Sequence, residues 1–202
     1  ISATMQIFTA GSGSTDQTRI GFTGSDFLNV NRNIGGSEVE LLSTKKFRDI
    51  NGWYHLVVQN NSGTAAVYVN GVAVSLNSSS LGTNKINQAS VVHQIGDTPA
   101  SGENFNGLMS HIHFVDGTAL TPSTFGETGT YGEWKPKEVV DVTYGTNGFY
   151  LDFKLSATGT GGIGKDQSGN GNDFASSGYA ATDQMLDSPT NNFCTFTPLS
   201  NS

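Results

Sequence analysis

Apolar and polar residues alternate with a period of two along most of this 202-residue chain, and this alternation limits the possible folds more than any other feature. Successive side chains of a β-strand point to opposite faces, so the pattern is that of strands with one buried face. No segment keeps apolar residues at helical spacing for three turns. Clusters of Gly, Asn and Ser separate the alternating segments, as turns separate strands. The sequence therefore predicts an all-β protein.

The alternation predicts ten strands. They are residues 5–9, 18–23, 27–30, 38–43, 53–59, 65–69, 72–76, 91–95, 107–115 and 148–153. Asn70-Gly71 separates two of them and predicts a tight hairpin, because both residues tolerate the positive φ of a type I′ turn. Thr121 and Pro122 predict one helical turn, with Thr121 as N-cap.

The composition disfavours two classes of partner, nucleic acids and membranes. A net charge of -7 and a pI near 4.8 disfavour nucleic acid and anionic membranes, since phosphate binding needs clustered Lys and Arg. No segment approaches the ~20 apolar residues of a membrane span, so we expect no membrane insertion. The single cysteine, Cys194, cannot form an internal disulfide. Charged residues are only 13% of the chain, which predicts a surface of Ser, Thr, Asn and Gln.

The β pattern weakens toward the C-terminus. Residues 126–137 are Gly-rich and polar around Trp134, which predicts a loop packed by one aromatic residue. Four glycines fall in the six residues 159–164. We therefore expect a main domain over residues 1–155 and a loop-rich C-terminal arm over residues 156–202, which completes the domain or leads to a following one.

Several central motifs resemble a known family. Phe47-Arg48-Asp49, Trp53-Tyr54-His55-Leu56-Val57-Val58 and Val67-Tyr68-Val69-Asn70-Gly71 are similar to the central strands of laminin G-like, concanavalin A-like domains. Residues 105–112 and the Leu120-Thr121-Pro122 turn resemble the late part of the same domains. The resemblance implies an antiparallel β-sandwich of the jelly-roll, concanavalin A-like lectin/glucanase fold. Because the Ser-Phe-Trp-like opening strand of that family does not precede Ile1, we expect a piece truncated at its N-terminus.

Later motifs resemble structural proteins of marine tailed phages. They are Phe125-Gly126-Glu127, Trp134-Lys135-Pro136-Lys137 and the segments 144–153, 166–174 and 187–193. This resemblance implies a bacteriophage virion protein of a tail fibre, an appendage or a capsid decoration, located on the extracellular particle. It further implies other virion subunits as partners, a homo-oligomer and attachment to a host surface glycan.

Enzymatic motifs are weak. Glycosidases need two carboxylates flanking one bond, and Glu38 and Glu40 are the only such pair on one face of a credible strand. We interpret them as a surface pair. Gly-x-Ser-x-Gly is absent, and no histidine motif accompanies Cys194. We therefore expect no enzymatic activity.

Two groups of residues are candidate binding sites. Asp166, Asn170, Asn172 and Asp173 alternate with glycines in a segment that suits calcium, although successive Asx-turns have the same pattern. Tyr131 and Trp134 are candidates for a glycan-stacking platform, with loop packing as the alternative. His111 and His113, on one face of a predicted strand, offer part of a metal site or a purely structural pair.

Three functions remain at this point. The first is a virion structural module that mediates subunit assembly and host attachment. The second is a carbohydrate-binding, lectin-like module outside a virion, and the third, disfavoured by the missing paired carboxylates, is a polysaccharide-degrading jelly-roll enzyme.

Overall fold

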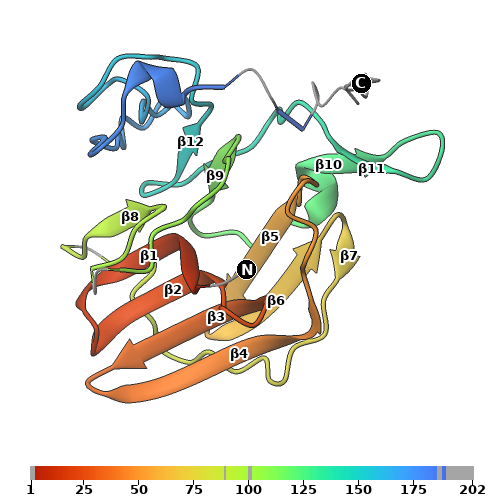
Figure 1. Cartoon of the computed structure of the whole chain (residues 1–202), viewed down its shortest axis with the longest axis vertical. Helices are drawn as coiled ribbons and strands as arrows, with labels where there is room; N and C mark the ends of the chain where they lie inside the picture. The colour runs from red at the N-terminus through yellow and green to blue at the C-terminus, as the bar shows by residue number, and fades with distance from the viewer. Residues whose placement is uncertain (1–2, 89, 100–101, 186–187, 190–202) are drawn as a thin grey trace, which may run out of the picture.

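The computed structural model describes residues 3–88, 90–99, 102–185 and 188–189, and within them the fold is almost entirely β-structure (Figure 1). The largest sheet has the antiparallel order β4-β3-β2-β1-β8. Its strands are β1 (Met5–Gly13), β2 (Asp16–Phe22), β3 (Phe27–Ile34), β4 (Ser37–Lys46) and β8 (His93–Ile95). A second sheet contains β5 (Leu56–Asn61), β6 (Thr64–Val69) and β7 (Val72–Ala73).

Two short antiparallel ribbons and two 3₁₀ helices complete the described structure. The ribbons pair β9 (Ile112–Phe114) with β12 (Phe149–Leu151) and β10 (Gly126–Thr128) with β11 (Trp134–Pro136). The 3₁₀ helices are η1 (Pro122–Thr124) and η2 (Ala181–Asp183). No helix in the described residues is long and apolar enough to cross a membrane.

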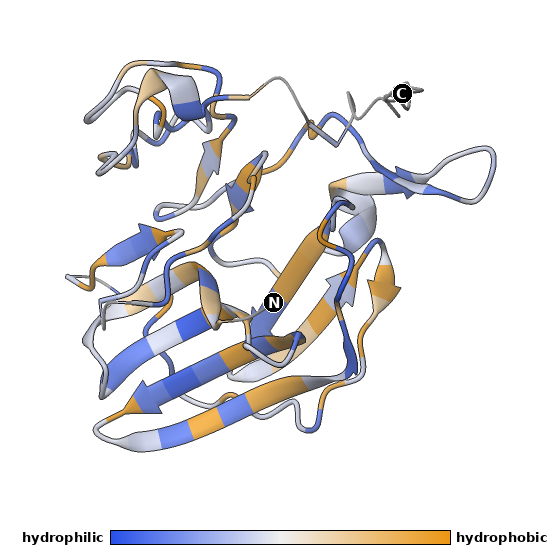
Figure 2. Cartoon of the chain, in the orientation of Figure 1, coloured by the Kyte–Doolittle hydropathy of each residue, from blue (hydrophilic) through white to orange (hydrophobic). Residues whose placement is uncertain are grey.

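The core lies between the two larger sheets and confirms the predicted β-sandwich. Leu28 and Val30 of β3 and Leu41 of β4 belong to this core, and Figure 2 shows the alternation of apolar and polar residues as changes of colour along β4. The buried cluster consists of Ile20, Leu28, Val30, Leu41, Phe47, Ala65, Val67, Val69, Val74 and Leu81. Burying one face of each sheet supplies the main stabilisation of such a fold.

The predicted hairpin at Asn70-Gly71 is confirmed. Val69 pairs with Val72, and the two residues between them have φ values of +50° and +76°, as a type I′ turn requires. The result is the predicted unit of three consecutive antiparallel strands, β5 to β7.

A short segment after β7 joins the two sheets. Ser43 of β4 forms a bridge with Leu76, and the backbone N–H of Thr44 donates to the carbonyl of Ser75 at 2.8 Å. Asn77 forms two hydrogen bonds with Leu42 of β4. Its side-chain oxygen accepts from the backbone N–H of Leu42 at 2.9 Å, and its own backbone N–H donates to the Leu42 carbonyl at 2.9 Å. This pairing protects the edge of β4 from other chains.

Some predicted boundaries were wrong. The expected strand 107–115 is reduced to β9, because His111 has a φ of +50° that no strand accommodates. Strand 53–59 begins only at Leu56, and Trp53, expected in the core, is half-buried before it. The expected loop 126–137 is instead the β10–β11 hairpin. The helical turn exists as η1, but the Thr121 hydroxyl bonds Ser123 and does not cap it.

Residues 152–185 confirm the loop-rich character expected of the C-terminal part. Apart from η2 and a single bridge between Leu151 and Asp166, this stretch has no regular structure in its described residues. Cys194 lies outside the described residues.

Candidate functional site

Asp166 organises the loop that was predicted to bind calcium. Its carboxylate accepts hydrogen bonds from the backbone N–H groups of Tyr150, Ser168 and Asn172 and from the Ser168 hydroxyl, at 2.8–2.9 Å. The residue is only 4% exposed. Burial alone would raise the pKa of this carboxyl, but the hydrogen bonds outweigh burial and the pKa is lowered.

Asn170 and Asn172 connect this loop to the segment before β12. The Asn170 amide nitrogen donates to the carbonyls of Gly145 and Gly148 at 2.6 and 2.8 Å. The Asn172 amide nitrogen donates to the carbonyls of Thr146 and Gly148 at 3.0 and 2.9 Å. Carbonyl oxygens only accept, so these contacts fix which end of each amide faces the neighbouring loop. Two loops that are distant in sequence are thereby held together.

Asp173 closes the same loop. Its carboxylate accepts from the N–H of Asp166 at 2.9 Å and lies 3.1 Å from the Lys165 ammonium, and both contacts lower its pKa, the backbone bond most. The four candidate calcium ligands are therefore close together, but their side chains already bind protein groups. In the described residues only Asp166 does so as an Asx-turn, by accepting from the N–H of Ser168, whereas the other three bond groups that are seven or more residues away. In the described residues, no group of three or more His, Cys, Asp and Glu residues is arranged to hold a metal ion. Calcium binding stays a prediction.

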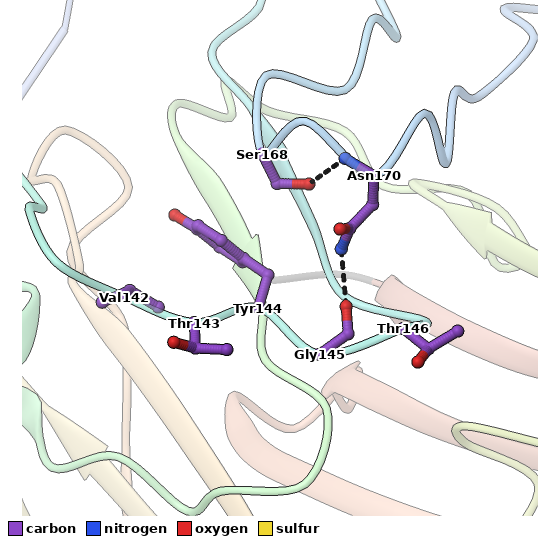
Figure 3. A pocket seen from close by; sticks show the side chains of 7 residues that line it. All are labelled: Val142, Thr143, Tyr144, Gly145, Thr146, Ser168 and Asn170. Carbon is purple, nitrogen blue, oxygen red and sulfur yellow. Dashed lines mark hydrogen bonds between the residues drawn. The ribbon is translucent and has the colours of Figure 1, made fainter.

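A pocket of about 430 Å³ lies where the two loops meet (Figure 3). Its described lining consists of Val142, Thr143, Tyr144, Gly145, Thr146, Ser168 and Asn170. None of these residues is charged, and together they offer one aromatic ring with its phenol hydroxyl, three aliphatic hydroxyl groups and one side-chain amide. The volume falls in the range of small-molecule sites, about 300 to 1,000 Å³.

Tyr144 is the aromatic wall of this pocket, and a histidine holds it in place. Its hydroxyl shares a hydrogen bond of 2.7 Å with Nδ1 of His113, and the two rings are stacked 15° apart. His113 stacks in turn on Tyr150, with ring centroids 4.2 Å apart. Burial raises the pKa of Tyr144 to about 12. Burial, reinforced by His111 and His55, lowers the pKa of His113 to about 4. Both rings are therefore neutral at neutral pH.

His111 and His113 both lie beside Tyr150 and not on one strand face. The His111 ring stacks on Tyr150 at 6.1 Å, and its Nδ1 lies 2.7 Å from the Ser110 hydroxyl. Both rings stack on Tyr150, which fits the structural interpretation of this pair.

Tyr131 and Trp134, the predicted stacking pair, have different environments in the structure. A Cβ added to Gly71 would lie 2.4 Å from the Trp134 ring, and one added to Gly126 would lie 2.7 Å from it. The ring also contacts His55 at a centroid distance of 5.7 Å. Trp134 therefore fastens the β10–β11 hairpin to the sandwich and is no exposed platform, whereas Tyr131 at the hairpin tip is 94% exposed.

Glu38 and Glu40 project from the outer face of β4. Glu40 accepts from the amide of Asn29 at 2.8 Å, and Glu38 accepts from the amide of Asn31 at 2.7 Å. Arg19 adds a salt bridge of 3.3 Å to Glu38. Both carboxylates thus take part in a polar network across the sheet, as the surface interpretation expects.

A sandwich of antiparallel sheets is the fold of lectin-like binding modules. The chain belongs to the concanavalin A-like lectin/glucanases superfamily, whose laminin G-like family model matches residues 1–124, more than half of the chain. No curated protein and no solved structure matches it. The pocket lies beyond the matched residues.

The pocket was missed in the sequence because its two walls are more than twenty residues apart. The only signal was indirect. The sequence pattern made Asn170 and Asn172 candidate oxygen ligands or Asx-turn residues, whereas in the structure their amide nitrogens join the two walls.

Proposed function

We propose that this chain is a non-catalytic attachment module of a phage virion structural protein, and that it binds a neutral glycan of the host surface in the loop pocket. The observation that carries the proposal is the pocket lining, in which a fixed tyrosine ring lies among uncharged hydroxyl and amide groups. Sugars bind proteins through such a combination, since their ring faces are apolar and their edges carry hydroxyls.

The pocket has hydroxyl groups that are available to bond a ligand. The hydroxyls of Thr143 and Thr146 are exposed and make no hydrogen bond to any described part of the chain. The Ser168 hydroxyl, by contrast, is used by Asp166. A ligand can therefore bond both threonines without breaking an internal contact.

The net charge of the chain favours a neutral ligand. A chain of net charge -7 repels acidic polysaccharides, and the described pocket lining holds no Lys or Arg to offset this. We accordingly expect neutral hexose or amino-sugar residues rather than uronic or sialic acids.

The virion context is supported by the phage-like motifs between residues 125 and 193 and by the uncharged polar surface, which suits repeated contacts between subunits. On this proposal the module belongs to a fibre, an appendage or a capsid decoration, and its partners are other virion subunits and further copies of itself. A lectin-like module outside a virion is the alternative.

Binding is tested on immobilised neutral and acidic glycans with the whole chain, followed by calorimetry on retained sugars. Thr143→Val with Thr146→Val removes two hydroxyls with little change of shape, and Thr83→Val is the matched control at another exposed site. We expect the double variant to bind at least about tenfold more weakly, with the control unchanged. Retention of no glycan, or equal affinity of the double variant, would overturn the pocket assignment.

The virion location is tested separately, by antibody-gold labelling of this chain on whole particles in cryo-electron micrographs. Label on head or tail projections is the expected result. Unlabelled particles with intact glycan binding would favour the module outside a virion.

A further inference from the structure

The β10–β11 hairpin projects from the body of the protein (Figure 1, at the right). Glu127 pairs with Lys135 across the two strands, in register and with a salt bridge of 3.2 Å. The base of the hairpin is held by Trp134 packed against Gly71 and Gly126. A ribbon anchored in this way has a defined direction relative to the sandwich.

The tip of the hairpin is ordered by its own hydrogen bonds. The N–H of Gly129 donates to the Glu133 carbonyl at 2.7 Å, and the N–H of Gly132 donates to the Gly129 carbonyl at 3.1 Å. The Glu133 carboxylate accepts from the N–H of Tyr131 at 3.0 Å. Tyr131 itself is 94% exposed, more than any other large apolar residue that the structure describes. An aromatic side chain on a preorganised tip docks with little loss of entropy.

The β10–β11 hairpin also has two unpaired edges, and an exposed apolar residue of β7 lies beside its base. Neither outer edge shares a backbone hydrogen bond with another described strand, and such edges accept strands of other chains. Val72, next to Gly71 at the hairpin base, is 63% exposed. Apolar side chains therefore occur both at the tip and at the base.

The charge of the hairpin indicates which partner it accepts. Residues 126–137 contain Glu127, Glu133, Lys135 and Lys137, so their net charge is zero in a chain of net charge -7. Two copies of the chain repel each other over an acidic surface, but this repulsion is absent along the hairpin.

We propose that the β10–β11 hairpin is a homodimerisation element. Two hairpins pair side by side about a two-fold axis, so that Tyr131 of each copy lies on Val72 at the base of the other. A two-fold contact uses the same patch on both subunits, which a neutral ribbon with apolar tip and base provides. This inference rests on the self-association included in the proposed function and names the element that carries it, and it does not depend on the loop pocket or on glycan binding.

The first test is the association of the whole chain, measured without glycan by sedimentation velocity over a dilution series. We expect a reversible dimer whose dissociation constant rises at least about tenfold in Tyr131→Ser. Ile50→Ser is the control, since Ile50 is 81% exposed elsewhere on the molecule. A wild type that stays monomeric at every concentration overturns the proposal, and so does a Tyr131→Ser variant that associates as tightly as wild type.

The second test locates the contact. In a Cys194→Ser background, Thr130→Cys together with Val72→Cys is expected to form disulfide-linked dimers, because the tip of one copy then lies at the base of the other. Each single cysteine variant serves as a control and stays largely uncrosslinked. Equal crosslinking of a single variant would contradict the side-by-side arrangement.

Discussion

Tyr144 and His113 share a hydrogen bond of 2.7 Å between the phenol oxygen and Nδ1, and their rings lie 15° apart. His113 is paired in the β9–β12 ribbon with Tyr150, on which its ring also stacks. The aromatic wall of the pocket is thus connected through one imidazole to a strand pair. The protonation state of that imidazole therefore affects both stability and the pocket.

Acid is expected to destabilise the fold in a window set by the histidines whose pKa values burial lowers, of which His113 has the large shift and His55 and His111 shift in the same direction. Burial lowers the pKa of His113 from 6.5 to about 4, so the folded protein keeps this ring neutral while the unfolded chain takes up a proton. Stability is therefore lost as the pH falls from about 6.5 to about 4, by up to about 3 kcal/mol. Urea unfolding at several pH values measures this loss.

The double variant His113→Phe with Tyr144→Phe is the control for this window. It keeps an aromatic ring at each position and removes the two atoms that share the hydrogen bond together with the titratable imidazole, so its stability is expected to fall less over the same pH range. Asp166 does not contribute there, because its pKa is lowered from 3.8 and its stabilisation is lost only below that value. An unchanged pH profile of the double variant would assign the effect to other groups.

Gly71→Ala is expected to weaken the attachment of the hairpin. Gly71 has a φ of +76°, and a Cβ there would lie 2.4 Å from two carbon atoms of Trp134. Gly36→Ala is the matched control, since Gly36 has a φ of +81° and no atom within 4 Å of an added Cβ. We expect a cost of about 1 kcal/mol for the control and about 3 kcal/mol for Gly71→Ala, measured by urea unfolding. Equal costs would mean that Trp134 does not pack there.

Asp166→Ala is expected to cost about 3 kcal/mol, because three backbone N–H groups and the Ser168 hydroxyl lose a buried acceptor. The loop pocket should be lost with them, so glycan binding should fail as well. Glu138→Ala removes an exposed acid and is expected to change stability by less than about 0.5 kcal/mol. The free energy of unfolding in urea distinguishes the two.

Calcium removal is expected to leave the melting temperature within about 2 °C of its value in millimolar calcium. The reason is that both oxygens of Asp166 already accept protein hydrogen bonds, which a cation would have to displace. Differential scanning calorimetry with chelator and with calcium measures the difference. A larger stabilisation by calcium, absent in Asp166→Asn, would establish the metal site that the sequence pattern suggests.

Local patterns predicted the strands of the sandwich well. Apolar residues that recur with a period of two indicate a strand with one buried face. Asn70-Gly71 indicates a tight turn, because both residues tolerate positive φ. Neither the strands nor the turn requires knowledge of the rest of the fold. The β10–β11 hairpin could not be predicted from the sequence. Its strands have only three residues, which is too short to show alternation. In addition, Trp134 is positioned by a contact with Gly71, which is far away in sequence.

The sequence by itself determined an all-β protein, since burial periodicity and turn chemistry are local properties. The antiparallel sandwich of the concanavalin A-like kind was implied by the resemblance of its central motifs to that family. Only the tertiary structure decided the roles of Asn170, Asn172, Trp134 and Tyr131. An asparagine in a Gly-rich segment can present its oxygen to a cation or its nitrogen to a carbonyl, and an aromatic residue can pack or lie exposed. The choice depends on which distant segment lies against it, here the 144–148 loop and the β6–β7 turn, and no local pattern encodes that contact.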